Sequence, residues 1–375
     1  MRIGILGGAF DPIHLGHVGV ARAAIKHLGL DRVLMLPSGE PPYKACRASR
    51  TDRMKMVELA CAGDESLVPC DAEIARPGKT YTVDTLRELR RNNPADEYIY
   101  IIGTDAVKSL GKWRGIDEIR ALAGFAVIAR PGFDGSGVDI DCQVIPGEGL
   151  DISSGMVRDR VAEGKPIGEL VPEGVAGYIE SRGLYLCDYT EAEIMEKLKR
   201  TISLHRWHHT LGVADTAERL AARYGVNPKK ARLAALLHDC AKSLPYGEMR
   251  RIVSANVPDA DEAELDAEPV LHAPAGMVLA RRDYGVRDPG ILQAIRRHTL
   301  GGDHMTPMDA LIYVSDFIEP GRKSFPGLEE ARALAETDIF AAMRLSAKLS
   351  NDYLISRGQQ PHPKTVALIT GGEAQ

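Results

Sequence analysis

With 375 residues, 44% of them hydrophobic, the chain is too long for one ordinary domain and apolar enough to form two cores. A net charge of −5 argues against a protein built to neutralise a nucleic-acid backbone, and no apolar run approaches the roughly 20 residues that a membrane-spanning helix needs. The six cysteines form no C-x-x-C pair and no signal peptide precedes them, so we expect a reduced, cytoplasmic protein with small-molecule partners.

The first half of the chain alternates short β-rich runs with helical patterns, from Met1 to about Cys187. This alternation predicts βα units and a doubly wound parallel sheet over residues 1–187. A last short strand is expected in the linker LYLCDYTEAE. The segments that carry the alternation are the predicted strands RIGILGG, RVLMLPSG, YIYIIGTD and GFAVIARPG and the predicted helices VGVARAAIKHLG and DRMKMVELACAG.

The second half changes character after about Asp188. Runs of Val and Ile give way to long helical patterns rich in Ala, Leu, Glu and Arg. We therefore predict an all-α domain over residues 188–375.

The first predicted strand leads into GGAFDPIHLGH, residues 7–17, and then into a helix. Gly7 and Gly8 lack side chains where the chain leaves the strand, which would let a ligand approach the helix amino end, where free N–H groups favour anions. The segment is neither a Walker loop nor G-x-G-x-x-G, yet it predicts a phosphate site. His14 and His17 could donate to phosphate oxygens and stabilise a leaving pyrophosphate.

GGAFDPIHLGH resembles the signature of nucleotidyltransferases with an H-x-G-H motif, and specifically that of bacterial nicotinate-nucleotide adenylyltransferases. The resemblance implies a Rossmann-like fold and adenylyl transfer from ATP, with Mg²⁺, to nicotinate mononucleotide, giving nicotinate adenine dinucleotide and pyrophosphate. In-line attack on the α-phosphate needs no covalent enzyme intermediate. Further stretches over residues 1–187 resemble the family in the same order: PPYK, TDRMKM, YTVDTL, IIGTDAVKSLGKW and DISSGMVR.

The same resemblance implies roles for individual residues. It implies catalytic roles for His14, His17, Lys44 and Arg158. Ser153 or Ser154 as N-cap would leave helix amides and Arg158 aimed at an anion. The nucleotide-binding residues that it implies are Gly7, Gly8, Phe10, Thr82, Asp84, Asp105, Trp113, Arg130, Ser153 and Ser154.

Two positions depart from the pattern of that family. Tyr43 stands where the family usually has His, and Gly155 where it usually has a hydroxyl residue. Because the other phosphate-site residues remain, we expect altered phosphate contacts and retained activity.

Five predicted helices of the second half each place an ionisable residue on an apolar face. His238, for example, aligns with Ala234 and Ala241 in AALLHDCAKSLP. One such histidine is ordinarily a satisfied core residue, but several together are hard to satisfy without cations. The inward set is His209, His238, His272, His298 and Asp316, with Asp239 as a sixth member.

Mixed imidazole and carboxylate ligation suits zinc, iron, manganese or cobalt. Asp239 could bridge two neighbouring ions, and a water between them would become a nucleophile at neutral pH. Lys242, one turn beyond His238, is either a phosphate contact or a solvated helix lysine. Cys240 should point away from the ligands and pack in the core.

This half resembles the HD superfamily of metal-dependent phosphohydrolases, and more closely the YqeK-type HD proteins, which hydrolyse diadenosine tetraphosphate symmetrically to two ADP. The resemblance covers about residues 195–335 and implies catalytic roles for Asp239 and Lys242. It implies two metals, usually iron: a first held by His209, His238, Asp239 and Asp316, and a second completed by His272 and His298. Arg206 and His208 could line the mouth. Surface positions are expected for His205, His208, His304 and His362.

The sequence thus predicts a bifunctional enzyme of NAD biosynthesis and nucleotide hydrolysis, with ATP, nicotinate mononucleotide and diadenosine tetraphosphate as partners. The alternatives are adenylylation of nicotinamide mononucleotide or of pantetheine phosphate, and an HD domain that cleaves another nucleotide or senses one without turnover. An α-half that serves only as an oligomerisation scaffold is a third alternative. The oligomeric state, with a homo-oligomer among the options, and any communication between the two sites stay open.

Overall fold

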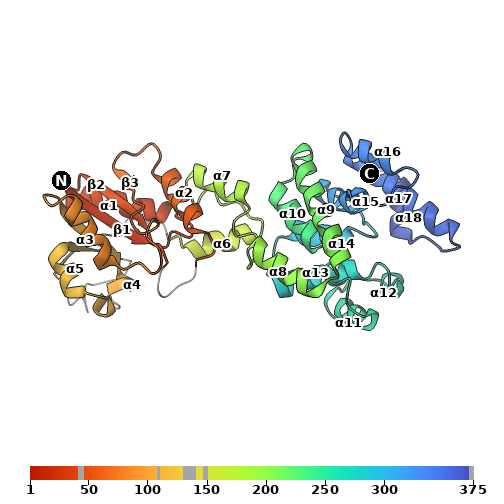
Figure 1. The fold of residues 1–375 in the computed structure, drawn as a ribbon, viewed down its shortest axis with the longest axis horizontal. Helices are drawn as coiled ribbons and strands as arrows, with labels where there is room; N and C mark the ends of the chain where they lie inside the picture. Colours follow the sequence, from red (N-terminus) through yellow and green to blue (C-terminus); the bar gives the residue numbers. More distant parts are fainter. Residues whose placement is uncertain (41–45, 108–109, 130–140, 147–150, 371–375) are drawn as a thin grey trace. The chain divides into compact units, whose positions relative to one another are not determined.

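The computed structural model describes residues 1–40, 46–107, 110–129, 141–146 and 151–370, except the side chains of residues 105 and 106. Contacts divide the chain into one compact unit of residues 1–161 and 166–179 and a second of residues 162–165 and 180–375. The domain boundary expected after Cys187 stays a prediction. Figure 1 shows strands and helices in the first unit and helices in the second.

Six parallel strands form one sheet in the first unit, in the order β3-β2-β1-β4-β5-β6. The central strands are near-continuous apolar runs because helices on both faces bury them. The predicted Rossmann-like, doubly wound sheet is confirmed. The strands are β1 (Arg2–Gly8), β2 (Arg32–Pro37), β3 (Leu67–Pro69), β4 (Glu97–Gly103), β5 (Gly124–Ala129) and β6 (Cys142–Pro146).

Strand β1 lies where the strand order reverses, between β2 and β4. Its residues 2–6 pair in register with residues 97–101 of β4. The carboxyl ends of both strands therefore meet at one edge, where doubly wound sheets bind ligands. The helices up to the boundary are α1 (Leu15–Leu28), α2 (Arg50–Cys61), α3 (Thr82–Asn92), α4 (Thr104–Val107), α5 (Ile116–Leu122), α6 (Ser154–Ala162) and α7 (Glu173–Arg182).

The strand predicted in LYLCDYTEAE is wrong, because residues 184–189 form turns and bends and helix α8 (Glu191–Thr201) begins directly after Thr190. Tyr185 has a φ of 66°, which is incompatible with a strand. Both Tyr185 and Cys187 are buried, and Cys187 belongs to the core of the second unit. Packing against that core decides the conformation here, and sheet pairing plays no part.

The second unit is all-α over its described residues, as predicted. Helices α9, α10, α14 and α15 form a closed ring of contacts, since α9 and α14 each pack against both α10 and α15. Helix α13 packs against α14. A bilayer-spanning helix is not found among the described residues. The helices are α8 (Glu191–Thr201), α9 (Leu204–Ala221), α10 (Pro228–Leu237), α11 (Tyr246–Asn256), α12 (Glu262–Asp266), α13 (His272–Tyr284), α14 (Pro289–Arg297), α15 (Pro307–Ile318), α16 (Leu328–Ala335), α17 (Ile339–Ser356) and α18 (Pro363–Thr370).

Helices α10 and α14 share one local design. Each begins at a polar N-cap followed by proline: Asn227 accepts from two backbone N–H groups at the start of α10, and Asp288 does so at the start of α14. Each ends at a histidine C-cap, His238 or His298. The helix ends thus place two imidazoles directly beyond two buried helices.

Candidate active sites

The neighbours of the double glycine at the end of β1 leave no room for a side chain at Gly7 and little room at Gly8. A Cβ on Gly7 would lie 2.3 Å from the hydroxyl of Tyr100 in β4, and a Cβ on Gly8 would lie 3.2 Å from the ring of Phe10. Tyr100 and Phe10 are themselves buried. Packing therefore explains Gly7, whereas the contact at Gly8 is only tight, and the close approach of a ligand stays a prediction.

Two imidazoles stack at the start of α1. The rings of His14 and His17 lie 3.6 Å apart between centroids, and the backbone N–H of His14 donates to Nδ1 of His17 over 3.2 Å. Burial lowers the pKa of His14 to about 4, and burial together with His14 lowers the pKa of His17 well below its ordinary value. The pair is therefore uncharged at neutral pH. Nδ1 of His14 has no hydrogen-bond partner among the described residues.

The start of α6 contacts the loop that contains these histidines. Ser153 is the N-cap, since its Oγ accepts a backbone N–H of the first turn over 3.1 Å. Ser154 Oγ donates to the carbonyl of Pro12 over 2.8 Å, and Arg158 Nη1 donates to the carbonyl of Asp11 over 2.5 Å. The structure thereby brings DISSGMVR, where an anion is expected at the helix start, against the predicted phosphate site in GGAFDPIHLGH.

The remaining predicted nucleotide-binding residues are less fully placed. The Trp113 ring meets Tyr100 edge-on with centroids 5.7 Å apart, and Thr82 is the first residue of α3. Asp84 forms an ion pair with Arg87 of its own helix over 2.9 Å. Asp105 is the second residue of α4, which follows β4, but its side chain lies outside the described residues, as do Lys44 and Arg130.

Arg53, which was not predicted as a site residue, connects the loops after β1 and β2. Its side chain is 1% exposed, and it donates to the carbonyls of Ala9, Ser38 and Gly39 over 2.6 to 2.8 Å. A buried arginine needs such partners. The motif TDRMKM contains Arg53 and could have pointed to it. In the structure Arg53 holds the loop that carries His14 and His17.

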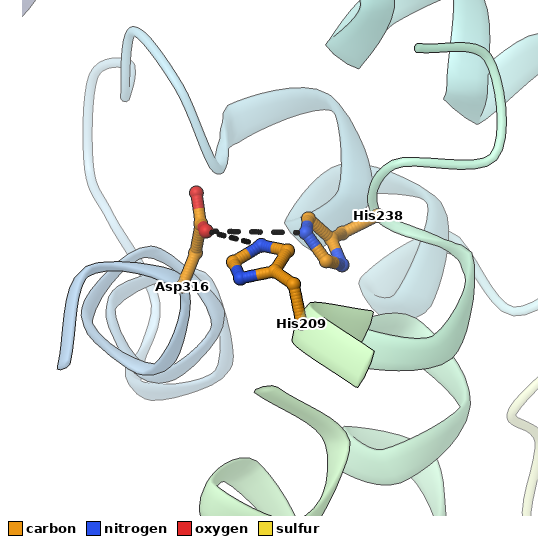
Figure 2. A group of neighbouring side chains, drawn as sticks. All are labelled: His209, His238 and Asp316. Atoms are coloured by element: carbon orange, nitrogen blue, oxygen red, sulfur yellow. Dashed lines mark ion pairs between the residues drawn. The ribbon is translucent and has the colours of Figure 1, made fainter. Parts of the chain in front are cut away.

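In the second unit, side chains from three elements meet at one point. Nε2 of His209 in α9 lies 3.0 Å from Oδ1 of Asp316 in α15, and Nε2 of His238 lies 4.0 Å from the same oxygen. Figure 2 shows the three side chains pointing toward one another. Three such donor atoms so close together could hold a metal ion.

A second group shares His238 and adds Asp239, His272 and His298. Asp239 Oδ1 lies 3.0 Å from Nε2 of His272 and 3.8 Å from Nε2 of His298, whereas Oδ2 lies 3.7 Å from Nε2 of His238. The two imidazole nitrogens of His272 and His298 are 3.2 Å apart. The two oxygens of Asp239 thus face different histidines, an arrangement that suits a carboxylate bridge between two ions.

Backbone carbonyls orient two of the imidazoles. His238 Nδ1 lies 2.6 Å from the carbonyl of Ala235, and His298 Nδ1 lies 2.7 Å from that of Ile295. With the proton on Nδ1, each Nε2 turns a lone pair inward. His238 is fully buried, and its Nε2 has no hydrogen-bond partner among the described residues. An orphaned, buried imidazole nitrogen among carboxylates fits a metal ligand.

The expected helix through AALLHDCAKSLP is wrong in its second half, because α10 ends at Leu237 and turns follow. His238 therefore caps the helix, and its alignment with Ala241 on one helical face does not hold. The carbonyl that orients His238 is free only because the helix ends there. Cys240 packs as expected: it is buried, and burial raises its thiol pKa to about 12.

Most of the predicted ligands have the protonation state that a metal requires. Burial lowers the pKa of His238, and it lowers that of His272 to about 4, so both imidazoles are neutral. Burial alone would raise the pKa of Asp239 and Asp316, but the facing histidines hold both carboxyls below their ordinary values. His209 differs: burial disfavours its charge, yet Asp316 and Glu319 raise its pKa overall.

Among the described residues, three basic side chains contact this ligand set. Arg206 pairs with Asp239, and Arg322 Nη2 lies 2.7 Å from Oδ1 of Asp316. Lys242 Nζ lies 3.0 Å from Nε2 of His272, and burial lowers its pKa. Arg322 was missed at the sequence level, although it stands only six positions after Asp316. Positive charge thus lies directly beside the candidate metal centre.

The histidines expected at the surface lie there with one exception. His205, His208 and His304 are exposed. His362 is half-buried instead, and its Nδ1 accepts the backbone N–H of Lys364 over 3.2 Å. It precedes α18, whose first turn bonds to its backbone carbonyl, so the helix start draws it inward.

Comparisons with known proteins match the two halves separately. The cytidylyltransferase-like family model matches residues 5–160, and the HD domain model matches residues 206–343. A probable nicotinate-nucleotide adenylyltransferase of Shouchella clausii is 43% identical over 186 residues, which are 49% of this chain and 96% of the relative. One of Halalkalibacterium halodurans is 44% identical over 189 residues, 49% of this chain and 91% of that protein.

A solved structure matches the other half. It is the crystal structure of a predicted HD superfamily hydrolase involved in NAD metabolism from Clostridium acetobutylicum. The identity is 34% and the TM-score 0.47, and the match covers 48% of this chain and 96% of that one.

Proposed function

The chain belongs to the nicotinate-nucleotide adenylyltransferase family over its N-terminal half and carries an HD domain after it, and from this we propose a bifunctional enzyme. Its first half transfers the adenylyl group of ATP to nicotinate mononucleotide. Its second half hydrolyses diadenosine tetraphosphate symmetrically to two ADP with two divalent metals, which we propose to be iron.

For adenylyl transfer, the 5′-phosphate oxygen of nicotinate mononucleotide attacks the α-phosphorus of ATP, whose bond to the pyrophosphate oxygen breaks. His14 and His17 offer neutral N–H donors beside the amino end of α1, where negative charge on the departing pyrophosphate would develop. Mg²⁺ accompanies ATP. Arg53 and the α6 contacts hold this loop, so the donors are placed before the substrate arrives.

The observation that supports the hydrolase most strongly is the orphaned Nε2 of His238, fully buried between Asp239 and Asp316. HD domains bind divalent metals, and His209, His238, Asp239 and Asp316 would hold one ion here. His272 and His298 would complete the second site, with Asp239 as the bridge. When bound, such ions polarise a phosphoryl oxygen and lower the pKa of a water.

The basic residues around this centre favour a polyphosphate substrate. Arg206 and Arg322 pair with the candidate ligands Asp239 and Asp316, and Lys242 contacts the candidate ligand His272, so each could turn to a phosphate oxygen when a metal ion takes its place at that ligand. Hydrolysis attaches water oxygen to one of the two central phosphorus atoms and breaks the bond to the bridging oxygen between them. The leaving ADP keeps that oxygen.

The test is to incubate the intact chain separately with ATP plus nicotinate mononucleotide and with diadenosine tetraphosphate plus Fe²⁺ or Mn²⁺. We expect nicotinate adenine dinucleotide in the first reaction and ADP, without AMP or ATP, in the second. Nicotinamide mononucleotide or pantetheine phosphate as the better acceptor would overturn the first assignment. Binding of the tetraphosphate without ADP release would overturn the second and indicate a nucleotide sensor.

Replacing Arg322 with alanine should lower kcat/KM for diadenosine tetraphosphate about 10- to 100-fold, because a charge-assisted hydrogen bond to phosphate is worth about 1.5 to 3 kcal/mol. The metal content of Arg322→Ala should be at least that of the unsubstituted chain. The substitution removes the guanidinium that competes with the metal for Asp316. The matched control is Arg281→Ala, an exposed arginine of α13. Equal kinetics in the two variants would show that Arg322 does not contact substrate.

A further inference from the structure

Glu319 lies just beyond α15, three residues after the candidate ligand Asp316, and is 4% exposed. Its Oε1 lies 3.2 Å from Nδ1 of His209, the nitrogen opposite the one that faces Asp316. Its Oε2 accepts the backbone N–H of Gly321 over 2.5 Å. A buried carboxylate is thus fixed behind one imidazole of the metal centre.

Two glycines leave the space that this carboxylate occupies. A Cβ on Gly212, in α9 beyond His209, would lie 2.7 Å from Oε2 of Glu319, and a Cβ on Gly321 would lie 2.9 Å from it. Arg332 Nη2 donates to the backbone carbonyl of Glu319 over 3.0 Å. Hydrogen bonds therefore hold both the carboxylate and the backbone carbonyl of Glu319.

The position of His209 explains why it needs such a partner. His238 and His298 cap their helices, so a last-turn carbonyl is free to accept the proton on Nδ1. His209 lies inside α9, where the carbonyls are engaged in helical hydrogen bonds. Its acceptor must come from another element, and α15 brings Glu319.

We propose that Glu319 is a positioning residue that fixes the orientation and proton location of His209, so that Nε2 is presented to the first metal as a strongly basic ligand. The proposal rests on the metal centre proposed above. A carboxylate behind a metal-binding imidazole raises ligand basicity more than a carbonyl does, and loss of such a partner typically weakens metal affinity about 10- to 100-fold. The end of α15 would then supply both a ligand, Asp316, and the support for its neighbour.

The test is a titration of the intact, metal-stripped chain with Mn²⁺. The electron paramagnetic resonance signal of free Mn²⁺ measures how much of the ion is bound. Glu319→Ala should weaken the tighter binding step about 10- to 100-fold. Gly212→Ala should weaken Mn²⁺ binding to the same extent. Its methyl group would push the Glu319 carboxylate away from His209, although Glu319 itself is retained. Glu319→Gln should fall in between, since its carbonyl oxygen can still accept the His209 proton.

Glu264→Ala is the matched control, because Glu264 is equally buried but pairs with Lys364 away from the ligands. Unchanged Mn²⁺ affinity in Glu319→Ala, or an equal loss in Glu264→Ala, would overturn the proposal. If Glu319→Ala does not fold, the isosteric Glu319→Gln replaces it. Unchanged Mn²⁺ affinity in that variant would then overturn the proposal. No substrate is present, so inactivity toward diadenosine tetraphosphate would refute the proposed hydrolase while leaving this result intact.

Discussion

Replacing Asp239 with asparagine should abolish metal-dependent hydrolysis while leaving adenylyl transfer unchanged. Asp239 faces His272 through one oxygen and His238 through the other, so the substitution removes the charge shared by both candidate ion sites. Loss of a residue that only hydrogen-bonds to a metal ligand already costs about 10- to 100-fold in metal affinity or activity. Loss of a ligand that bridges two ions should therefore cost more than about 100-fold. ADP release and metal content per chain would be measured together.

The matched control for that variant is Asp352→Asn, on the exposed face of α17. It should keep its metal and its ADP release. Because asparagine matches aspartate in shape, a fall in metal content cannot be ascribed to lost packing. An Asp239→Asn chain that retains two ions and full ADP release would refute Asp239 as the bridge.

Replacing His17 should lower adenylyl transfer about 100- to 1,000-fold, the usual effect of removing one donor aimed at developing charge. Two variants separate chemistry from structure. His17→Ala also loses the acceptor for the His14 N–H, whereas the side-chain oxygen of His17→Asn can replace Nδ1 in that bond. We therefore expect low kcat in both variants and a lower melting temperature in the alanine variant alone.

The control for the histidine pair is His27→Ala, an exposed position in the last turn of the same helix. Formation of nicotinate adenine dinucleotide and release of ADP would be followed in each variant. Hydrolysis of diadenosine tetraphosphate should be unaffected throughout. Normal dinucleotide formation by His17→Asn would show that the ring of His17 takes no part in the transfer.

Local patterns in the sequence were sufficient for much of the fold. The apolar runs around residues 3–6 and 98–102 identified β1 and β4, and the periodicity around His209 placed it on a buried helix face. Such patterns encode which face of an element is buried, because burial repeats with the period of the element itself. They failed at LYLCDY, where Tyr185 is buried with a positive φ and Cys187 packs into the helical core.

The sequence also identified the six candidate metal ligands, because each is an ionisable residue among apolar neighbours. It could not show how they meet. The closed ring of α9, α10, α14 and α15, together with α13 packed against α14, brings them together, and its contacts join residues as far apart as His209 and Glu319, 110 positions away.

What the sequence by itself determined was the alternation of strands and helices in the first half, the all-α character of the second half and the residue types able to carry the chemistry, since these depend on local composition and spacing. Only the tertiary structure decided that β1 and β4 end side by side, that α10 stops at Leu237 and leaves a carbonyl for His238, and that Glu319 and Arg322 reach the same centre. Those outcomes depend on packing between distant segments, which no local pattern encodes. His238 and Asp239 interrupt an apolar segment because the fold surrounds them with partners from four other elements.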